Sequence, residues 1–146
     1  MVDVKARAEA FWADVFNRHD LSRIEEFIAQ GSVNHNARAG TPDGPQGARE
    51  VLGRLWSGSS DMRFQLESMI AEGNRVVCVG IMQGTHDGPF QGIPATNRPT
   101  SSRHIHVLSF DDDGLITDHL AVRDDVALLK QLGAIPDELP PHEDAT

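Results

Sequence analysis

The chain has 146 residues, of which 39% are hydrophobic and 24% charged, a composition typical of one folded domain with one core. Its formal net charge of -9 argues against nucleic acid and anionic membrane surfaces as main partners, because both require clustered Lys and Arg. No apolar run approaches the ~20 residues of a membrane span, the N-terminus has no signal-peptide stretch, and the one cysteine, Cys78, cannot form an intrachain disulfide. Together these features favour a cytoplasmic protein.

The first part of the chain has helical periodicity. Residues 4–17 carry apolar side chains on one stripe, which includes Trp12 and Phe16. A second helix is expected from Asp20, a candidate N-cap, to about residue 30. After a polar loop rich in turn formers, a third helix is expected over about 47–56.

The pattern then changes to the period of two that is typical of strands, over 63–71, 75–86, 103–110 and 115–125. The strand at 75–83 is apolar on both faces, so it needs cover on both, from helices on one side and a ligand cavity or a partner subunit on the other. A last helix is expected to start near residue 124 and to end at Gly133.

Helices first and antiparallel strands later predict an α+β fold, in which a cone-shaped, curved antiparallel sheet packs on N-terminal helices and encloses a pocket. We expect a single domain over residues 1–136 and an acidic, Pro-rich, frayed tail over 137–146.

One carboxylate stands out in the stretch "LITDHLAVRDD". In a strand, Asp118 shares a face with Ile116, Leu120 and Val122, where an unpaired carboxylate is costly to bury. It is therefore expected to be paired or to serve a chemical purpose.

The turn before this strand sets which residues face Asp118. A three-residue loop with Gly114 in the left-handed region pairs Asp111 with Leu115. A two-residue loop would instead turn Ile105 and Val107 toward Asp118. The glycine favours the three-residue loop, which places three residues of the preceding strand on the Asp118 face: Leu108, His106 and His104, opposite Asp118, Leu120 and Val122.

That face, one carboxylate and two imidazoles among apolar side chains, suits proton transfer, because a buried carboxyl group has a raised pKa and a histidine can donate to a developing enolate. Asp118, His104 and His106 are thus the candidate catalytic residues, and His119, which points the other way in this register, ranks lower. The plain alternative is a solvated or edge Asp. A metal held by His104 and His106 with His35 or Asp118 has no fixed ligand spacing in its favour.

Several stretches in order resemble the SnoaL-like polyketide cyclases: "VNHNARAG…GAREVLGRL", "AEGNRVVCVGIMQGTHDGPFQGIPATNRPT" and "GLITDHLAVRDDVALLKQLG". The resemblance implies the nuclear-transport-factor-two-like cone and an intramolecular aldol ring closure of a polyketide ester, without metal or organic cofactor. It implies that Asp118 is the acid/base and that His35 and His104 or His106 line the pocket. The further candidate substrate-binding residues are Leu120, Trp12, Phe16 and Leu108.

Other functions for the same cone stay open. Epoxide opening with Arg103 and Asp118, isomerisation of a steroid-like ketone, non-catalytic binding of an apolar small molecule, and a structural dimerisation module each fit part of the pattern. No Gly-rich phosphate loop is present. The expected partners are an apolar or polyketide-like small molecule and a second copy of the chain.

The expected homodimer interface is the sheet face opposite the pocket, which is too apolar to be left in water. In the predicted register this face carries Ile105, Val107, Thr117, His119 and Ala121.

Overall fold

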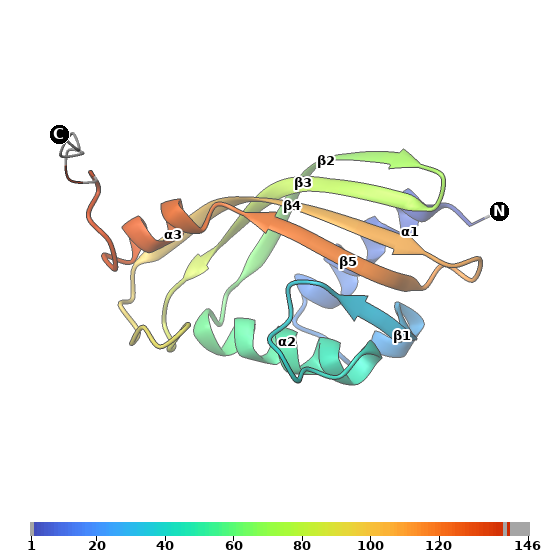
Figure 1. The fold of residues 1–146 in the computed structure, drawn as a ribbon, viewed down its shortest axis with the longest axis horizontal. Coiled ribbons are helices and arrows are strands. Elements are labelled where there is room, and N and C mark those ends of the chain that lie inside the picture. Colours follow the sequence, from blue (N-terminus) through green and yellow to red (C-terminus); the bar gives the residue numbers. More distant parts are fainter. Residues whose placement is uncertain (1, 139, 141–146) are drawn as a thin grey trace, which may run out of the picture.

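The computed structural model describes residues 2–138 and 140, so most of the predicted tail 137–146 lies outside the described residues. Figure 1 shows a five-stranded sheet in the order β1-β5-β4-β3-β2, with helices α1 (Val4–Ala10) and α2 (Gly44–Gly58) on one side and the short helix α3 (Asp125–Gln131) at one end. The strands are β1 (Ile28–Asn34), β2 (Arg63–Glu72), β3 (Arg75–Thr85), β4 (Pro99–Phe110) and β5 (Ile116–Arg123). The predicted α+β class is confirmed.

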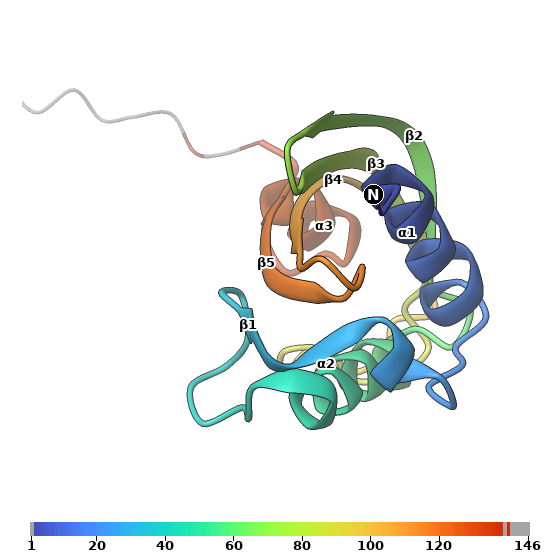
Figure 2. The ribbon, with the colours of Figure 1, turned by 90° about the vertical axis from the view of Figure 1, so that its right-hand side faces the viewer.

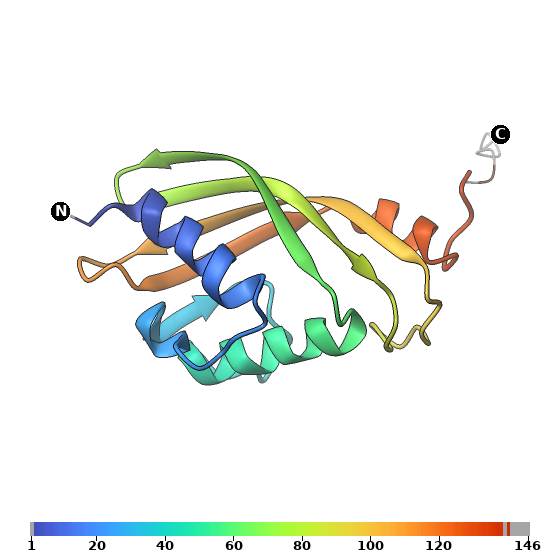
Figure 3. The same cartoon turned by 180° about the vertical axis from the view of Figure 1, so that it is seen from behind.

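The curvature of the sheet gives it a concave inner face. Figure 2 shows strands β2 to β5 curling round, with α1 and α2 on the concave side, and Figure 3 shows α1 lying across the sheet from behind. Helix α1 contacts β2 and β3, and α2 contacts β1. None of the helices in the described part of the chain combines the length and apolar character needed to cross a membrane.

The first predicted helix is present in two parts. Asp3 caps α1 by accepting from the backbone N–H of Ala6, and the chain continues as a π-helical turn over Phe11–Phe16. The wider turn carries Trp12 and Phe16, both 2% exposed, into the core. The expected stripe over residues 4–17 is thus confirmed.

The second predicted helix is wrong. A 3-10 turn, Ile24–Glu26, occupies part of the expected range, and β1 begins at Ile28 and pairs in parallel with β5. The backbone groups at the edge of β5 need partners, and this need for tertiary pairing outweighs the local helical pattern. Strand β1 thereby closes one side of the concave face.

The three antiparallel pairings form the hairpin ladder expected from the period-two segments. The buried face of β4 and β3 carries Leu108, Val76 and Cys78, all 0% exposed. Phe64 of β2 packs on Trp12, with ring centroids 4.3 Å apart. The core therefore fills one end of the concave face and leaves room further along it.

Candidate active site

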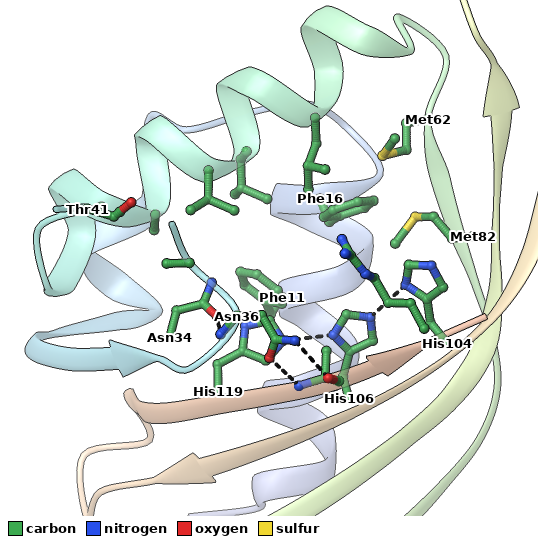
Figure 4. A pocket seen from close by; sticks show the side chains of 18 of the residues that line it. Phe11, Phe16, Asn34, Asn36, Thr41, Met62, Met82, His104, His106 and His119 are labelled. Atoms are coloured by element: carbon green, nitrogen blue, oxygen red, sulfur yellow. Dashed lines mark hydrogen bonds between the residues drawn. The ribbon is translucent and has the colours of Figure 1, made fainter. Parts of the chain in front are cut away.

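A cavity of about 190 Å³ lies between the concave face of the sheet, the π-helical turn Phe11–Phe16 and helix α2. Its apolar wall includes Phe11, Trp12, Phe16, Leu52 and Met82. Figure 4 shows Phe11 and Phe16 on one side of this space and a row of histidines on the other. The predicted internal pocket is present, with an apolar lining and a narrow polar strip.

Three imidazoles form that strip. His104 Nδ1 lies 3.3 Å from His106 Nε2, and His106 Nδ1 lies 2.8 Å from His119 Nε2. Each hydrogen bond has its proton on one of the two nitrogens, set by the ring tautomers. Trp12 packs edge-on against His106 with centroids 4.7 Å apart, which holds the middle ring in place. The result is a continuous chain of hydrogen bonds along the cavity floor (Figure 4).

All three imidazoles are held in the neutral form. Burial lowers the pKa of His104 to about 4, helped by the charge of Arg123, and burial lowers the pKa of His119 to about 4. Burial, then the neighbouring imidazoles, hold the pKa of His106 well below its usual range. At neutral pH each ring is therefore one donor and one acceptor.

A bulge in the β4–β5 hairpin decides which side chains reach this floor. The predicted three-residue loop is confirmed: Asp111 N–H donates to Leu115 O and Gly114 has a positive φ of 78°. The register then shifts by one residue, so that Ser109 pairs with Asp118 and Leu108 pairs with His119.

The predicted face of Asp118 is therefore wrong. Thr117 is the extra residue, and beyond it every side chain of β5 lies on the face opposite to the predicted one. Asp118 Oδ2 lies 2.6 Å from His35 Nε2, and both side chains are about half exposed, at 42% and 48%. Neither of them lines the cavity. The catalytic role of Asp118 loses its predicted geometric basis and stays a prediction.

The remaining candidate residues divide in the same way. His104, His106, Trp12 and Phe16 line the cavity, as expected. Leu108 faces inward but is buried in the core beside it, and Leu120 is 47% exposed on the outer face. The structure thus brings together the candidates on β4 and on the π-helical turn, and separates from them Asp118 and Leu120 on β5 and His35 just after β1.

The shift also brings in three residues that the predicted register placed outside. His119, Ala121 and Arg123 line the cavity from β5. Alternation along β5 does place these three residues on one face. It places them on the cavity face only if a bulge is assumed between Ile116 and Asp118. Nothing in the side-chain pattern marks that bulge.

Among the described residues, no group of three or more His, Cys, Asp or Glu side chains is arranged to hold a metal ion. The histidine geometry explains this, because His106 uses both ring nitrogens for neighbouring imidazoles, whereas a metal site needs free nitrogens converging on one point.

Comparison with known proteins fits this architecture. The family model described as SnoaL-like polyketide cyclase matches residues 6–132. The chain belongs to this family. The resemblance read from the ordered stretches, and the cone that it implied, are confirmed.

Comparison with individual proteins shows how far the similarity extends. An Aspergillus niger protein named "Probable cyclase otaY" is 28% identical over 79% of this chain and 87% of its own length. TsrD from Streptomyces laurentii is 28% identical, with a TM-score of 0.82 over 92% of this chain and all of its own. A SnoaL-like polyketide cyclase from Agrobacterium tumefaciens, 22% identical, shares the fold with a TM-score of 0.77 over 91% of this chain and 100% of its own.

Acidification should destabilise the protein through the pocket imidazoles. The unfolded chain binds protons at its histidines below about pH 6.5, whereas folded His104 and His119 bind them only near pH 4. The burial of these imidazoles therefore leaves the free energy of unfolding unchanged above pH 7. The free energy of unfolding falls as the pH drops from about 6.5 to 4, by roughly 2–3 kcal/mol for each histidine whose pKa is lowered in this way.

Urea unfolding between pH 7.5 and 4.5 measures this loss. In His104→Gln, which has no imidazole at that position, the slope over the same range should be visibly smaller. A free energy of unfolding that is flat over this range in the wild type would contradict the burial of neutral imidazoles.

Proposed function

We propose that the protein catalyses a cofactor-independent intramolecular aldol ring closure of a polyketide-derived carbonyl compound, an ester in the sequence-based prediction. Membership of the SnoaL-like family and the similarity to a protein named as a cyclase support a cyclase role. The apolar cavity can fold a flexible substrate into a reactive shape. The observation that carries the proposal is the line of three neutral imidazoles on the cavity floor.

The two ends of the histidine chain are available to a substrate. Within the described part of the chain, His104 Nε2 and His119 Nδ1 have no hydrogen-bond partner, and neither is among the buried polar atoms left unpaired. One end can accept a proton while the other donates one. Because the rings exchange protons along the chain, no imidazolium has to persist.

The reaction follows from this arrangement. One terminal imidazole takes the proton of a carbon flanked by carbonyl groups, and the resulting enolate attacks a second carbonyl carbon of the same molecule. The new carbon–carbon bond leaves an alkoxide, which takes a proton from the other end of the chain. A pKa near 4 makes each of the two terminal imidazoles, His104 and His119, a weak base, so the concerted transfer avoids the charged form that burial penalises.

Asp118 is the second candidate for the acid/base group, retained from the sequence resemblance. Asp118 pairs with His35 outside the cavity, so it could act only on a substrate that reached the outer face of β5. The two candidates predict opposite effects on kcat for His106→Gln and Asp118→Asn, so kinetic comparison of these variants distinguishes them.

The test of the cyclase activity uses aromatic polyketide methyl esters and the corresponding free acids, with product formation followed by mass spectrometry and absorbance. An aldol product of unchanged mass and new ring absorbance is expected. Activity should persist after treatment with a chelator, because none of the steps requires a metal. Recovery of every tested compound bound but unchanged would favour the non-catalytic binder.

We also propose that the protein forms a homodimer through the outer face of the sheet. The register shift corrects the composition of this face: His119 and Ala121 line the cavity, while Leu120 and Val122 take their place. Exposed apolar side chains span β2 to β5 on this face, which is too large an apolar patch for a stable monomer surface. They are Ile70, Ile105, Leu120 and Val122, joined by the half-buried Val77, Val79, Ile81 and Val107.

Light scattering at tens of micromolar protein is expected to give the mass of a dimer. Val122, 67% exposed at the outer face, should be critical, so that Val122→Glu shifts the mass toward the monomer because a charge would have to be buried in the interface. Val126→Glu on α3, 54% exposed and outside the face, is the matched control. A wild-type monomer at this concentration would refute the proposed dimer.

A further inference from the structure

One positive charge lies in the cavity of a protein whose net charge is -9. Arg123, at the end of β5, is the one Lys or Arg among the described residues that line the cavity. It is paired in register with His104 on β4, so the guanidinium stands on the same floor as the histidine chain. Apart from helping to keep His104 neutral, this charge has no part in the ring closure or the fold described above.

The contacts of Arg123 leave most of its hydrogen-bonding capacity unused. Its Nη2 lies 3.1 Å from Asp125 Oδ2, and that carboxylate is half exposed, which makes the pair weak and accessible to competition. Within the described residues, the other guanidinium N–H groups donate to no protein acceptor. A planar ligand group with two oxygens, such as a carboxylate, could therefore accept hydrogen bonds from the free N–H groups of the guanidinium.

The carboxylates that line the cavity stand at its margin. They are Asp125, on the first turn of α3, and Asp43, which precedes α2. The floor itself carries neutral imidazoles, and at His104 the Arg123 charge adds to burial in lowering the pKa, against a smaller opposing effect of Asp125. The potential near Arg123 and His104 therefore favours a negatively charged oxygen over a positive or neutral group.

We propose that the substrate carries a free carboxylate, held by Arg123 with the His104 imidazole beside it, while its apolar part lies against Phe11, Phe16 and Met82. The inference rests on the proposed function in one respect, that this cavity is the substrate site. It narrows the substrate class from an ester to an acid at this position. An ester has no charge to pair with the partly buried guanidinium, whereas a carboxylate can accept two charge-assisted hydrogen bonds from it.

The experiment compares two probes of equal size and shape, 2-naphthoate and 2-naphthamide, by isothermal titration calorimetry at pH 7.5. Arg123→Gln removes the charge. Arg103→Gln is the matched control, because Arg103 lies on the neighbouring strand but on the outer face, where it pairs with Glu67 at 3.1 Å. Asp125→Asn removes the carboxylate that competes for Arg123.

The wild type and Arg103→Gln should bind naphthoate about tenfold or more tighter than naphthamide, in line with the strength of charge-assisted hydrogen bonds. Arg123→Gln should lose that preference with naphthamide affinity unchanged, and Asp125→Asn should bind naphthoate a few-fold tighter than wild type. Equal affinity for the two probes in the wild type, a preference that survives Arg123→Gln, or absence of binding of either probe would overturn the proposal.

This outcome is independent of turnover. A carboxylate preference in a protein that cyclises no tested compound would refute the cyclase and leave the acid-binding site intact. Turnover of methyl esters at the same efficiency as their free acids would support the cyclase and refute the acid-binding site.

Discussion

Replacing His106 with Gln is expected to lower kcat by about 10² to 10⁴, the range of general acid/base catalysis, with little change in KM. His106 is the middle ring, bonded through both nitrogens, and a Gln side chain cannot accept a proton on one side while releasing one on the other. The apolar wall supplies most of the binding and is left unchanged. His119→Gln should cause a loss of similar size.

Asp118→Asn is the informative comparison. If the histidine chain moves the proton, this variant should retain kcat within a few-fold, because the Asp118 side chain lies outside the cavity and contacts His35 instead. If kcat falls by 10² or more in Asp118→Asn while His106→Gln stays near wild type, the catalytic assignment returns to the carboxylate. Melting temperatures of each variant exclude unfolding as the cause.

Phe64→Ala is expected to cost about 3–5 kcal/mol of unfolding free energy, the usual range for removing a fully buried aromatic ring. Phe64 is 1% exposed and packs against Trp12 at 4.3 Å and His106 at 5.2 Å between ring centroids. Its backbone is also held at both ends by Asn17, whose side chain bonds Phe64 N–H and O at 2.8 and 3.0 Å. The cavity left behind therefore cannot easily collapse.

Urea unfolding at pH 7.5 measures this cost. Val126→Ala, at an exposed position of α3, should change the stability by no more than about 0.5 kcal/mol. A Phe64→Ala variant that loses less than 1 kcal/mol would show that the packing of the π-helical turn on β2 contributes much less than the burial of Phe64 implies.

The parts of the fold that could be predicted are those in which the local sequence pattern is compatible with only one secondary structure. The period-two segments that predicted β2 to β5 are all present as strands, and Gly114 at φ 78° occupies the turn position expected for it. Helix α2 extends to Gly44, before the predicted start near residue 47, with Pro45 in its first turn. Strand β1 could not be predicted, because only its pairing with β5, far away in the chain, outweighs a helical pattern.

The same reasoning explains which part of the site was found. His104 and His106 lie on β4, whose register with β3 runs unbroken from Arg75 to Thr85, so alternation alone places them inward. On β5 the alternation is interrupted after Ile116. Thr117 suits either face, so the sequence contains no side-chain signal for the interruption, and His119 was placed on the wrong side.

The extra residue at Thr117 has a consequence for inferring chemistry from motifs. Asp118 and His119 are adjacent, and the backbone register alone decides which one enters the cavity. If the bulge moved beyond His119, or if the bulge were lost together with one residue of the hairpin, Asp118 would face the cavity in place of His119. The cavity would then contain a carboxylate instead of an imidazole, with no substitution at either position. An insertion or deletion in this hairpin can therefore change, in a single step, which ionisable side chain enters the cavity. Two cyclases that share the dipeptide Asp-His need not share a mechanism unless the spacing from turn to dipeptide and the bulge also agree.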